Sequence, residues 1–165
     1  MLESLITVFL VMLVFGLVAE LLISAFQVTR FEREKMQAAE AGQLALNRIQ
    51  CEVRESCKVE IGGTDKELTL TKFNARYVDD SRLLTNRFRY LLKIHYYVDA
   101  NSTLIRDVED LFNGGTQTHV VADGIQGARF EWAPDSDNLV TTLSVSVRGQ
   151  LRSISSEVCP QAFIP

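Results

Sequence analysis

The apolar segment at the N-terminus is the feature that most constrains how this chain can fold. Between Leu5 and Phe26 the only charged residue is Glu20. About 20 apolar residues in helical form cross a bilayer core of about 30 Å, so the segment predicts a single membrane-spanning helix. A cleaved secretory signal is the main alternative, but no Lys or Arg precedes the run and no small-x-small cleavage site ends it. We therefore expect the helix to be retained.

Helical sequence continues past the apolar segment. Beyond Phe26, apolar residues recur every three or four positions, which is typical of an amphipathic helix with one buried face. No proline or tight glycine pair appears before Gly62-Gly63, so we expect one helix from about Leu2 to about Ser56, roughly 80 Å long at 1.5 Å per residue. The predicted organisation is a transmembrane and assembly half over residues 1–26, an amphipathic half over 27–56, and a head domain over 57–165.

The rest of the chain reads as β-strands separated by turns. Runs rich in β-branched and aromatic residues, some with apolar–polar alternation, are typical of strands that bury one face. We expect strands at Val59–Ile61, Glu67–Lys72, Arg87–Val98, Leu104–Val108, His119–Val121, Ala128–Trp132, Leu139–Val147 and Gln150–Val158. One long helix followed by a meandering antiparallel sheet predicts an α+β fold with the helix packed on one face of the sheet.

Glu3 is a carboxylate at the edge of the apolar segment. An isolated ionised group in hydrocarbon costs several kcal/mol or more, so a carboxylate in this place indicates pairing, proton handling or assembly. The simpler interpretation is that Glu3 lies in the headgroup region, in contact with water. Glu20 is expected near the other membrane surface, where water makes a charge tolerable.

The N-terminal sequence Met1-Leu2-Glu3-Ser4-Leu5-Ile6, followed by Thr7-Val8-Phe9-Leu10-Val11, resembles the signature of type IV pilins and type II secretion pseudopilins. In that family a prepilin peptidase cuts after a glycine and a glutamate stands at the fifth mature position. The chain is similar to such a mature sequence lacking its first two residues. The resemblance therefore implies that Glu3 is the family's assembly glutamate, which meets the methylated N-terminal amine of a neighbouring subunit in the fibre.

A second resemblance runs along the middle of the chain. The segments Tyr96–Asp99, Leu104–Val108, Val120–Ile125 and Ala128–Trp132 are similar to the strand series of PilW-like minor pilins and J-type minor pseudopilins. The resemblance implies the ladle-shaped pilin fold and a subunit that waits in the bacterial inner membrane. It then joins other minor pilins or pseudopilins, the major pilin and a tip adhesin at a periplasmic or extracellular fibre tip, where it primes assembly.

Two other functions remain open from the sequence. The head could be a binding module that presents an adhesin, DNA or a secretion substrate at the tip, with the long loops Asn74–Asn86 and Asp110–Thr118 carrying recognition. The chain could also be a membrane-anchored periplasmic domain with no role in a fibre. The residues do not distinguish a pilus from a secretion pseudopilus.

Composition limits the remaining classes. With 165 residues and a net charge of −4, the chain is one ordinary domain and gives no reason to invoke nucleic acid. The sequence contains no nucleophile elbow, phosphate-binding glycine loop or HExxH helix, so we expect no enzyme and no cofactor.

The three cysteines are Cys51, Cys57 and Cys159. In an oxidising periplasm two of them are expected to pair, with the third left free or available to another subunit. Six residues on an intact helix separate Cα atoms by about 9 Å, beyond the reach of a disulfide. Cys51 and Cys57 therefore pair only if the helix ends before Cys57; otherwise Cys159 takes one of them.

No metal is expected. Neither His95 nor His119 stands at ligand spacing to a cysteine. Asp135, Asp137 and Asn138 crowd one loop and carry oxygen ligands of the kind calcium prefers, but the loop lacks the glycine and distal glutamate of an EF-hand, which favours a solvated turn.

Arg106 and Asp107 are adjacent charged residues on a predicted strand. We expect them to form part of a solvated cross-strand ion pair with a structural role, because exposed pairs of this kind are common and contribute little.

Overall fold

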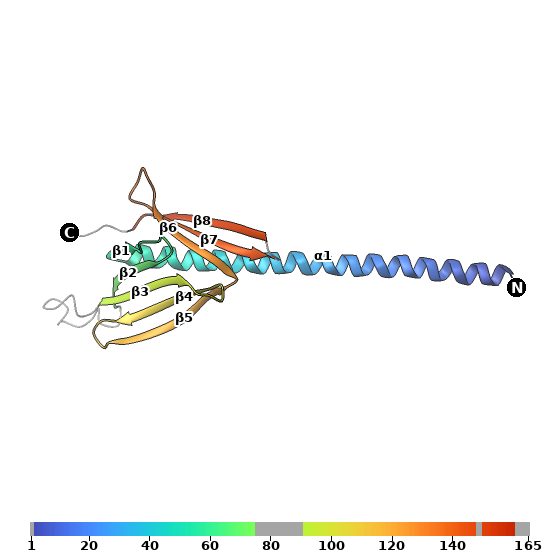
Figure 1. The fold of residues 1–165 in the computed structure, drawn as a ribbon, viewed down its shortest axis with the longest axis horizontal. Coiled ribbons are helices and arrows are strands. Elements are labelled where there is room, and N and C mark those ends of the chain that lie inside the picture. Colours follow the sequence, from blue (N-terminus) through green and yellow to red (C-terminus); the bar gives the residue numbers. More distant parts are fainter. Residues whose placement is uncertain (1, 75–90, 148–149, 161–165) are drawn as a thin grey trace. The chain divides into compact units, whose positions relative to one another are not determined.

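The computed structural model describes residues 2–74, 91–147 and 150–160, and side chains within this range except those of residues 2–5 and 147. The described chain contains one helix, α1 (Leu2–Glu55), and eight strands (Figure 1). The strands are β1 (Lys58–Ile61), β2 (Leu68–Phe73), β3 (Leu91–Val98), β4 (Thr103–Asp110), β5 (Gly115–Asp123), β6 (Ile125–Trp132), β7 (Leu139–Val147) and β8 (Gln150–Val158). The predicted positions 75–86 of the first loop and 87–90 of the third strand lie outside the described residues.

The chain divides into two compact units, an N-terminal unit (residues 1–37) and a head unit (residues 38–165). Helix α1 runs without interruption through residue 37 and ends at Glu55, which confirms the single long helix expected from about Leu2 to about Ser56. The predicted boundary at residue 26 between a membrane half and an amphipathic half stays a prediction.

The strands form two antiparallel sheets instead of one continuous meander. The first sheet has the order β1-β2-β3-β4-β5 and the second the order β6-β7-β8. The break falls between β5 and β6, where Gly124 adopts φ +76° and the chain reverses within one residue. A residue with a Cβ rarely adopts this conformation, so the glycine permits the turn. The α+β class is thus confirmed, whereas the expectation of a single sheet is wrong.

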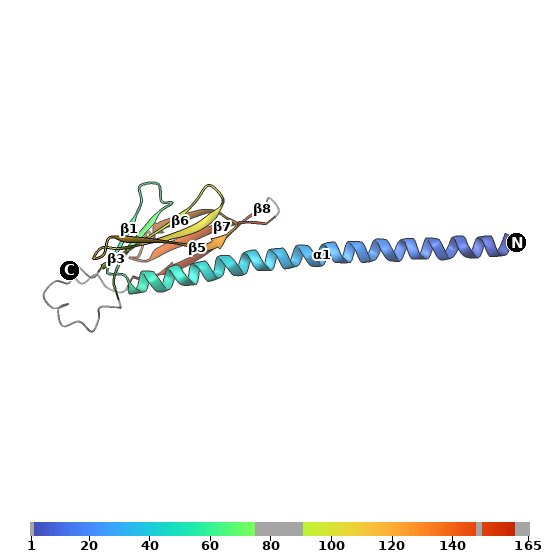
Figure 2. The same ribbon diagram turned by 90° about the horizontal axis from the view of Figure 1, so that it is seen from below.

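Both sheets cover the same side of residues 38–55 of α1 (Figure 2). Four helix residues with three- and four-residue spacing, Ala45, Leu46, Ile49 and Val53, are buried against the inner faces of the strands. From the strands, the fully buried side chains include Leu68, Leu70, Ile94, Phe130 and Leu143. Each fully buried large apolar side chain contributes about 1.5–3 kcal/mol, so this seam is the main stabilising contact of the head.

Gly42 lets the second sheet approach the helix closely. A Cβ added at this position meets Ile154 Cδ1 at 2.9 Å and Val145 Cγ2 at 3.2 Å. These distances are shorter than ordinary van der Waals contact, so a side chain at this position requires the Ile154 and Val145 side chains to shift. Close packing, not a turn, is what this position requires.

The connection between β3 and β4 is a tight turn, whereas the long loop expected at Asp110–Thr118 is wrong. Asp99–Ser102 joins β3 to β4, with Asp99 Oδ1 accepting hydrogen bonds from the backbone N–H of Asn101 and of Thr103. The predicted long loop Asp110–Thr118 is instead a short turn, because β4 extends to Asp110 and β5 begins at Gly115. Gly114 at φ +67° and the Asp110 carboxylate, which accepts from the N–H of Phe112, tighten this turn.

Candidate functional site

The N-terminal unit presents an apolar surface that nothing in the described structure covers. Large hydrophobic side chains over residues 6–28, called here the apolar segment, are about half to three-quarters exposed, as for Phe9 at 65% and Phe15 at 72%. The helix is long enough and apolar enough to cross a membrane, and its most apolar window has no residue buried inside the protein. Exposed apolar surface of this extent marks a contact with lipid or with another protein.

Polar groups are sparse along the apolar segment. Glu20 is exposed, and the Thr29 hydroxyl at its C-terminal end donates to the Ala25 carbonyl at 2.9 Å, which satisfies the hydroxyl within the helix. Gly16 has no neighbouring heavy atom within 4 Å, leaving the surface there open to close approach by another helix. Glu3 lies in α1, but its side chain is outside the described residues, so its role as an assembly residue stays a prediction.

A buried polar network ties α1 to the first sheet within the head unit. Glu52 on α1 accepts two hydrogen bonds from Arg106 on β4, with Nε to Oε2 at 3.1 Å and Nη2 to Oε1 at 2.6 Å. The Tyr96 hydroxyl on β3 donates to the same carboxylate at 2.7 Å. Three donors on one buried carboxylate satisfy the hydrogen-bonding requirement that burial imposes.

The electrostatics of this network favour one protonation state. Burial, together with the nearby Glu52 carboxylate, raises the pKa of Tyr96 well above its ordinary value, so the phenol stays protonated as a donor. Burial alone lowers the pKa of Arg106, but the hydrogen bonds and charge of Glu52 outweigh it and the net pKa is raised. The network is therefore a neutral phenol and an intact ion pair.

Arg106 corrects one sequence-based expectation. We expected a solvated pair with little energetic weight, whereas Arg106 is buried and its partner is 54 positions away in the chain. Asp107 does lie on the outer face, where its Oδ1 accepts from the Thr118 hydroxyl at 2.6 Å. The sequence did carry a signal for Glu52: it stands on the buried face of the amphipathic helix beside Val53, where a charge requires a partner.

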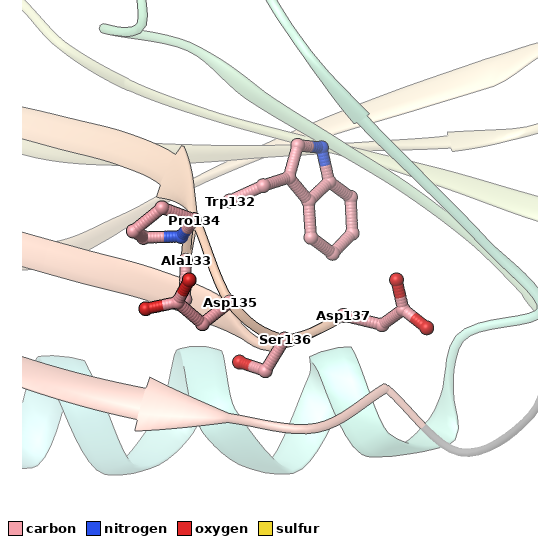
Figure 3. A pocket seen from close by; sticks show the side chains of 6 residues that line it. All are labelled: Trp132, Ala133, Pro134, Asp135, Ser136 and Asp137. Carbon is pink, nitrogen blue, oxygen red and sulfur yellow. The ribbon is translucent and has the colours of Figure 1, made fainter.

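The loop between β6 and β7 borders a depression of about 470 Å³ lined by Trp132 and residues 133–137. Figure 3 shows the carboxylates of Asp135 and Asp137 on opposite sides of this loop. Asn138 donates instead to Glu157 at 2.6 Å. Among the described residues no group of three or more His, Cys, Asp or Glu side chains is close enough to hold a metal ion.

All three cysteines are free and exposed. Helix α1 ends at Glu55, two residues before Cys57, so Cys51 lies in the helix and Cys57 lies outside it. Even so, the Cys57 thiol contacts the Thr71 carbonyl at 3.2 Å and the Cys159 thiol contacts the Pro160 carbonyl at 3.6 Å. The structure thus lacks the disulfide that the sequence suggested.

The two histidines make their described contacts with residues other than the cysteines. His95 on β3 faces Glu67 at 3.4 Å and stacks on Tyr97 with ring centroids 5.1 Å apart. His119 lies on β5, at the border of the first sheet. Both histidines lie on the surface of the first sheet. No described contact joins either of them to a cysteine.

Together the described residues define an α+β protein with a long N-terminal helix whose first half exposes an apolar surface suited to a membrane. No protein-family model matches the chain. Neither a curated protein nor a solved structure matches it.

Proposed function

We propose that this chain is a minor pilin or minor pseudopilin that primes and caps a type IV pilus or related fibre within a complex of minor subunits. The observation that carries the proposal is the unbroken 54-residue helix α1, whose apolar segment is exposed while its C-terminal residues are buried in the head. A subunit held first in a membrane and later in a fibre core needs such a helix, since lipid or neighbouring helices must cover the apolar segment in both states.

Glu3 supplies register in this proposal. Packing between apolar helices is tolerant of axial sliding, because one stripe of Leu, Val and Phe resembles the next. A carboxylate that must meet the terminal amine of a neighbour accepts only one axial offset, since other offsets leave both charges unpaired in an apolar surrounding. The priming role follows, because a subunit with fixed register presents the next helix with a defined place to dock.

The experiment that tests the function compares two carboxylates of the same helix. In cells that carry the sibling subunits, a Glu3→Ala variant is expected to insert into the membrane normally but to fall below about a tenth of the unsubstituted amount in sheared fibres, a loss that corresponds to about 1.4 kcal/mol or more. The matched Glu20→Ala variant is expected to enter fibres normally. Equal incorporation of both variants contradicts the role of Glu3.

A membrane-anchored periplasmic domain without a fibre role makes a different prediction. Its N-terminus keeps any leader that precedes the assembly residues, and it is found only in the membrane fraction. Mass spectrometry of the mature N-terminus distinguishes the two, because the proposed function requires cleavage by a prepilin peptidase and methylation of the new amine. The tip-binding alternative has lost one of its two expected loops, since Asp110–Thr118 is largely strand and turn.

A further inference from the structure

The outer borders of the two sheets differ in how they are protected. An edge strand exposes unpaired N–H and C=O groups that invite another strand, and proteins commonly block such edges with charge, proline, shortness or a covering segment. β1 is four residues long and carries the Lys58–Glu60 ion pair at 2.7 Å. β6 is covered, because the N–H of Phe130 donates to the Asp65 carbonyl at 2.7 Å and that of Ile125 to the Ser102 carbonyl at 2.8 Å.

Within the described part of the chain, β5 lacks these protections. It is nine residues long, and Gly115–Ala122 contains no proline and no residue with a formal charge at pH 7. β5 pairs only with β4 among the described strands, and Figure 1 shows it at one outer border of the head with β8 at the opposite border. An unprotected strand of this length is a template for pairing with a strand from another chain.

The directions of β5 and β8 are opposite relative to the helix. Gly42 packs against Ile154 and Gln50 donates to Ser156, so β8 runs the same way as residues 38–55 of α1. β2 also runs this way, because Leu68 pairs with Tyr96, a partner of Glu52, whereas Lys72 reaches Glu55 at 3.0 Å. Antiparallel pairing then makes β5 run against the helix.

We propose that β5 of one copy pairs antiparallel with β8 of a second copy whose helix points the same way. This step rests on the proposed function only in that copies anchored in one membrane point in one direction. An antiparallel β5–β5 pair needs a two-fold axis across the sheet, which turns the two helices in opposite directions and conflicts with a shared membrane. A β5–β8 contact leaves one free β5 and one free β8 at the ends, so it extends into a row of copies instead of closing as a dimer.

Side chains on the outer faces of the two strands fix a register. Thr116, Thr118 and Val120 share the outer face of β5, since Thr118 bonds Asp107, the residue after the inward-facing Arg106. On β8, Ile154 and Val158 pack inward, which places Leu151, Ser153 and Ser155 outward. Val120 is 61% exposed and Leu151 is 67% exposed.

With Val120 opposite Leu151 of the neighbouring copy, the antiparallel register sets Thr118 against Ser153 and Thr116 against Ser155. An apolar pair and two hydroxyl pairs are favourable cross-strand combinations, each contributing a fraction of a kcal/mol to about 1 kcal/mol. On the inner face the same register sets His119 against Arg152, and no two residues of like formal charge at pH 7 stand opposite each other over this stretch. Backbone hydrogen bonds along both edges add to the contact.

Cysteine crosslinking in membranes tests the register. The full-length chain, with Cys51, Cys57 and Cys159 replaced by serine, carries Val120→Cys and Leu151→Cys together and is oxidised with copper phenanthroline. Opposed strand residues have Cα atoms about 4.5–5.5 Å apart, within disulfide range, so a ladder of dimers and higher species is expected. The control pair, Val120→Cys with Leu44→Cys on α1, places the second thiol at a site that is 63% exposed but on no strand edge.

The expected result is at least tenfold more crosslinked product for the β5–β8 pair than for the control, with each single variant remaining monomeric. Equal yields for the two pairs, or efficient crosslinking of Val120→Cys alone, overturn the proposal. As a second arm, Val120→Lys is expected to abolish crosslinking between Thr118→Cys and Ser153→Cys, whereas Leu44→Lys leaves it unchanged. Crosslinking that persists at full yield in the Val120→Lys chain also overturns it.

The outcome is separable from that of the proposed function. If Glu3→Ala chains are lost from fibres but the β5–β8 pair does not crosslink, the strand contact is wrong and the fibre role stands. If the β5–β8 ladder forms in membranes while the N-terminus remains unprocessed and no chain enters fibres, the fibre role is wrong and the strand contact stands.

Discussion

Arg106 on β4 donates two hydrogen bonds, of 3.1 and 2.6 Å, to the carboxylate of Glu52 on α1 inside the head unit. Both side chains are about 9% exposed. Water therefore solvates neither charge well, and each charge is stabilised mainly by the other. This buried ion pair links α1 to the first sheet.

Removing one partner of the pair is expected to destabilise the head strongly. Glu52→Ala leaves the Arg106 charge buried without a counter-ion, and loss of a buried partner costs about 3–5 kcal/mol. Urea unfolding of the full chain in detergent, followed by the fluorescence of its single tryptophan, Trp132, measures the change. Glu67→Ala is the matched control, because this carboxylate is 53% exposed beside His95 and its loss is expected to cost less than about 1 kcal/mol.

The double variant Glu52→Leu with Arg106→Met separates an unpaired charge from lost packing. Replacing both members of a buried pair by apolar residues is often neutral or stabilising. The double variant is therefore expected to be more stable than either Glu52→Leu or Arg106→Met alone. A double variant that loses the sum of the two single losses contradicts this account of the network.

Tyr96 predicts a loss of stability at alkaline pH. Its pKa is raised in the folded head above the ordinary value of 10.0, so the unfolded chain releases the proton first. The stability contributed by this group is present below pH 10.0 and falls as the pH rises above it, by about 1.4 kcal/mol per pH unit while only the unfolded state has titrated. In Tyr96→Phe this part of the slope is expected to vanish, as measured by urea unfolding between pH 9 and pH 11, roughly one unit on each side of the ordinary tyrosine pKa.

Tyr96→Phe also measures the hydrogen bond itself at neutral pH. A hydrogen bond to a charged group contributes about 1.5–3 kcal/mol, and the carboxylate keeps Arg106 in this variant. A loss at the lower end of that range is expected. An unchanged alkaline slope in the variant would show that other groups cause the pH dependence.

Gly42 predicts a steric limit on the contact between α1 and the second sheet. In Gly42→Val the added side chain meets Ile154 and Val145 at distances that require these two side chains to shift, which costs about 1–3 kcal/mol as overpacking. Gly63→Val is the control, since a Cβ there meets nothing within 4 Å. The urea midpoint is expected to fall in the first variant and to change little in the second.

The apolar segment predicts that a charge in its middle weakens membrane retention. An Arg at the centre of a spanning helix costs about 2.5–3.5 kcal/mol on an insertion scale. Val14→Arg is expected to release more of the chain from membranes on carbonate extraction, whereas Leu44→Arg, an exposed position of the head unit, leaves retention unchanged. Equal retention of the two variants argues against a membrane position for the apolar segment.

We predict that all three cysteines react with a thiol reagent in the folded chain. Because Cys51, Cys57 and Cys159 are free and exposed, maleimide treatment of the folded chain without reductant is expected to add three labels. Intact-mass spectrometry reads this number directly. A single label indicates that two of them form a disulfide in the protein isolated from its own compartment.

The local elements followed from local sequence. An apolar run, then apolar residues every three or four positions without proline, was sufficient to place α1 to within a residue of its observed end at Glu55. β7 and β8 have the predicted bounds, Leu139–Val147 and Gln150–Val158, because their alternation reflects one buried and one exposed face. Each of these features depends on neighbours a few positions away, which is the range that a sequence pattern reports.

Pairings between distant segments were decided only by the tertiary structure. Arg106 looked solvated beside Asp107, and only the approach of α1 to β4 gives it Glu52 as a partner 54 positions away. The separation into two sheets likewise depends on how β6 meets Asp65 and Ser102, residues from earlier turns. Burial is a property of the folded chain. The residues next to a charged residue in the sequence do not show which distant group will bury it and pair with it.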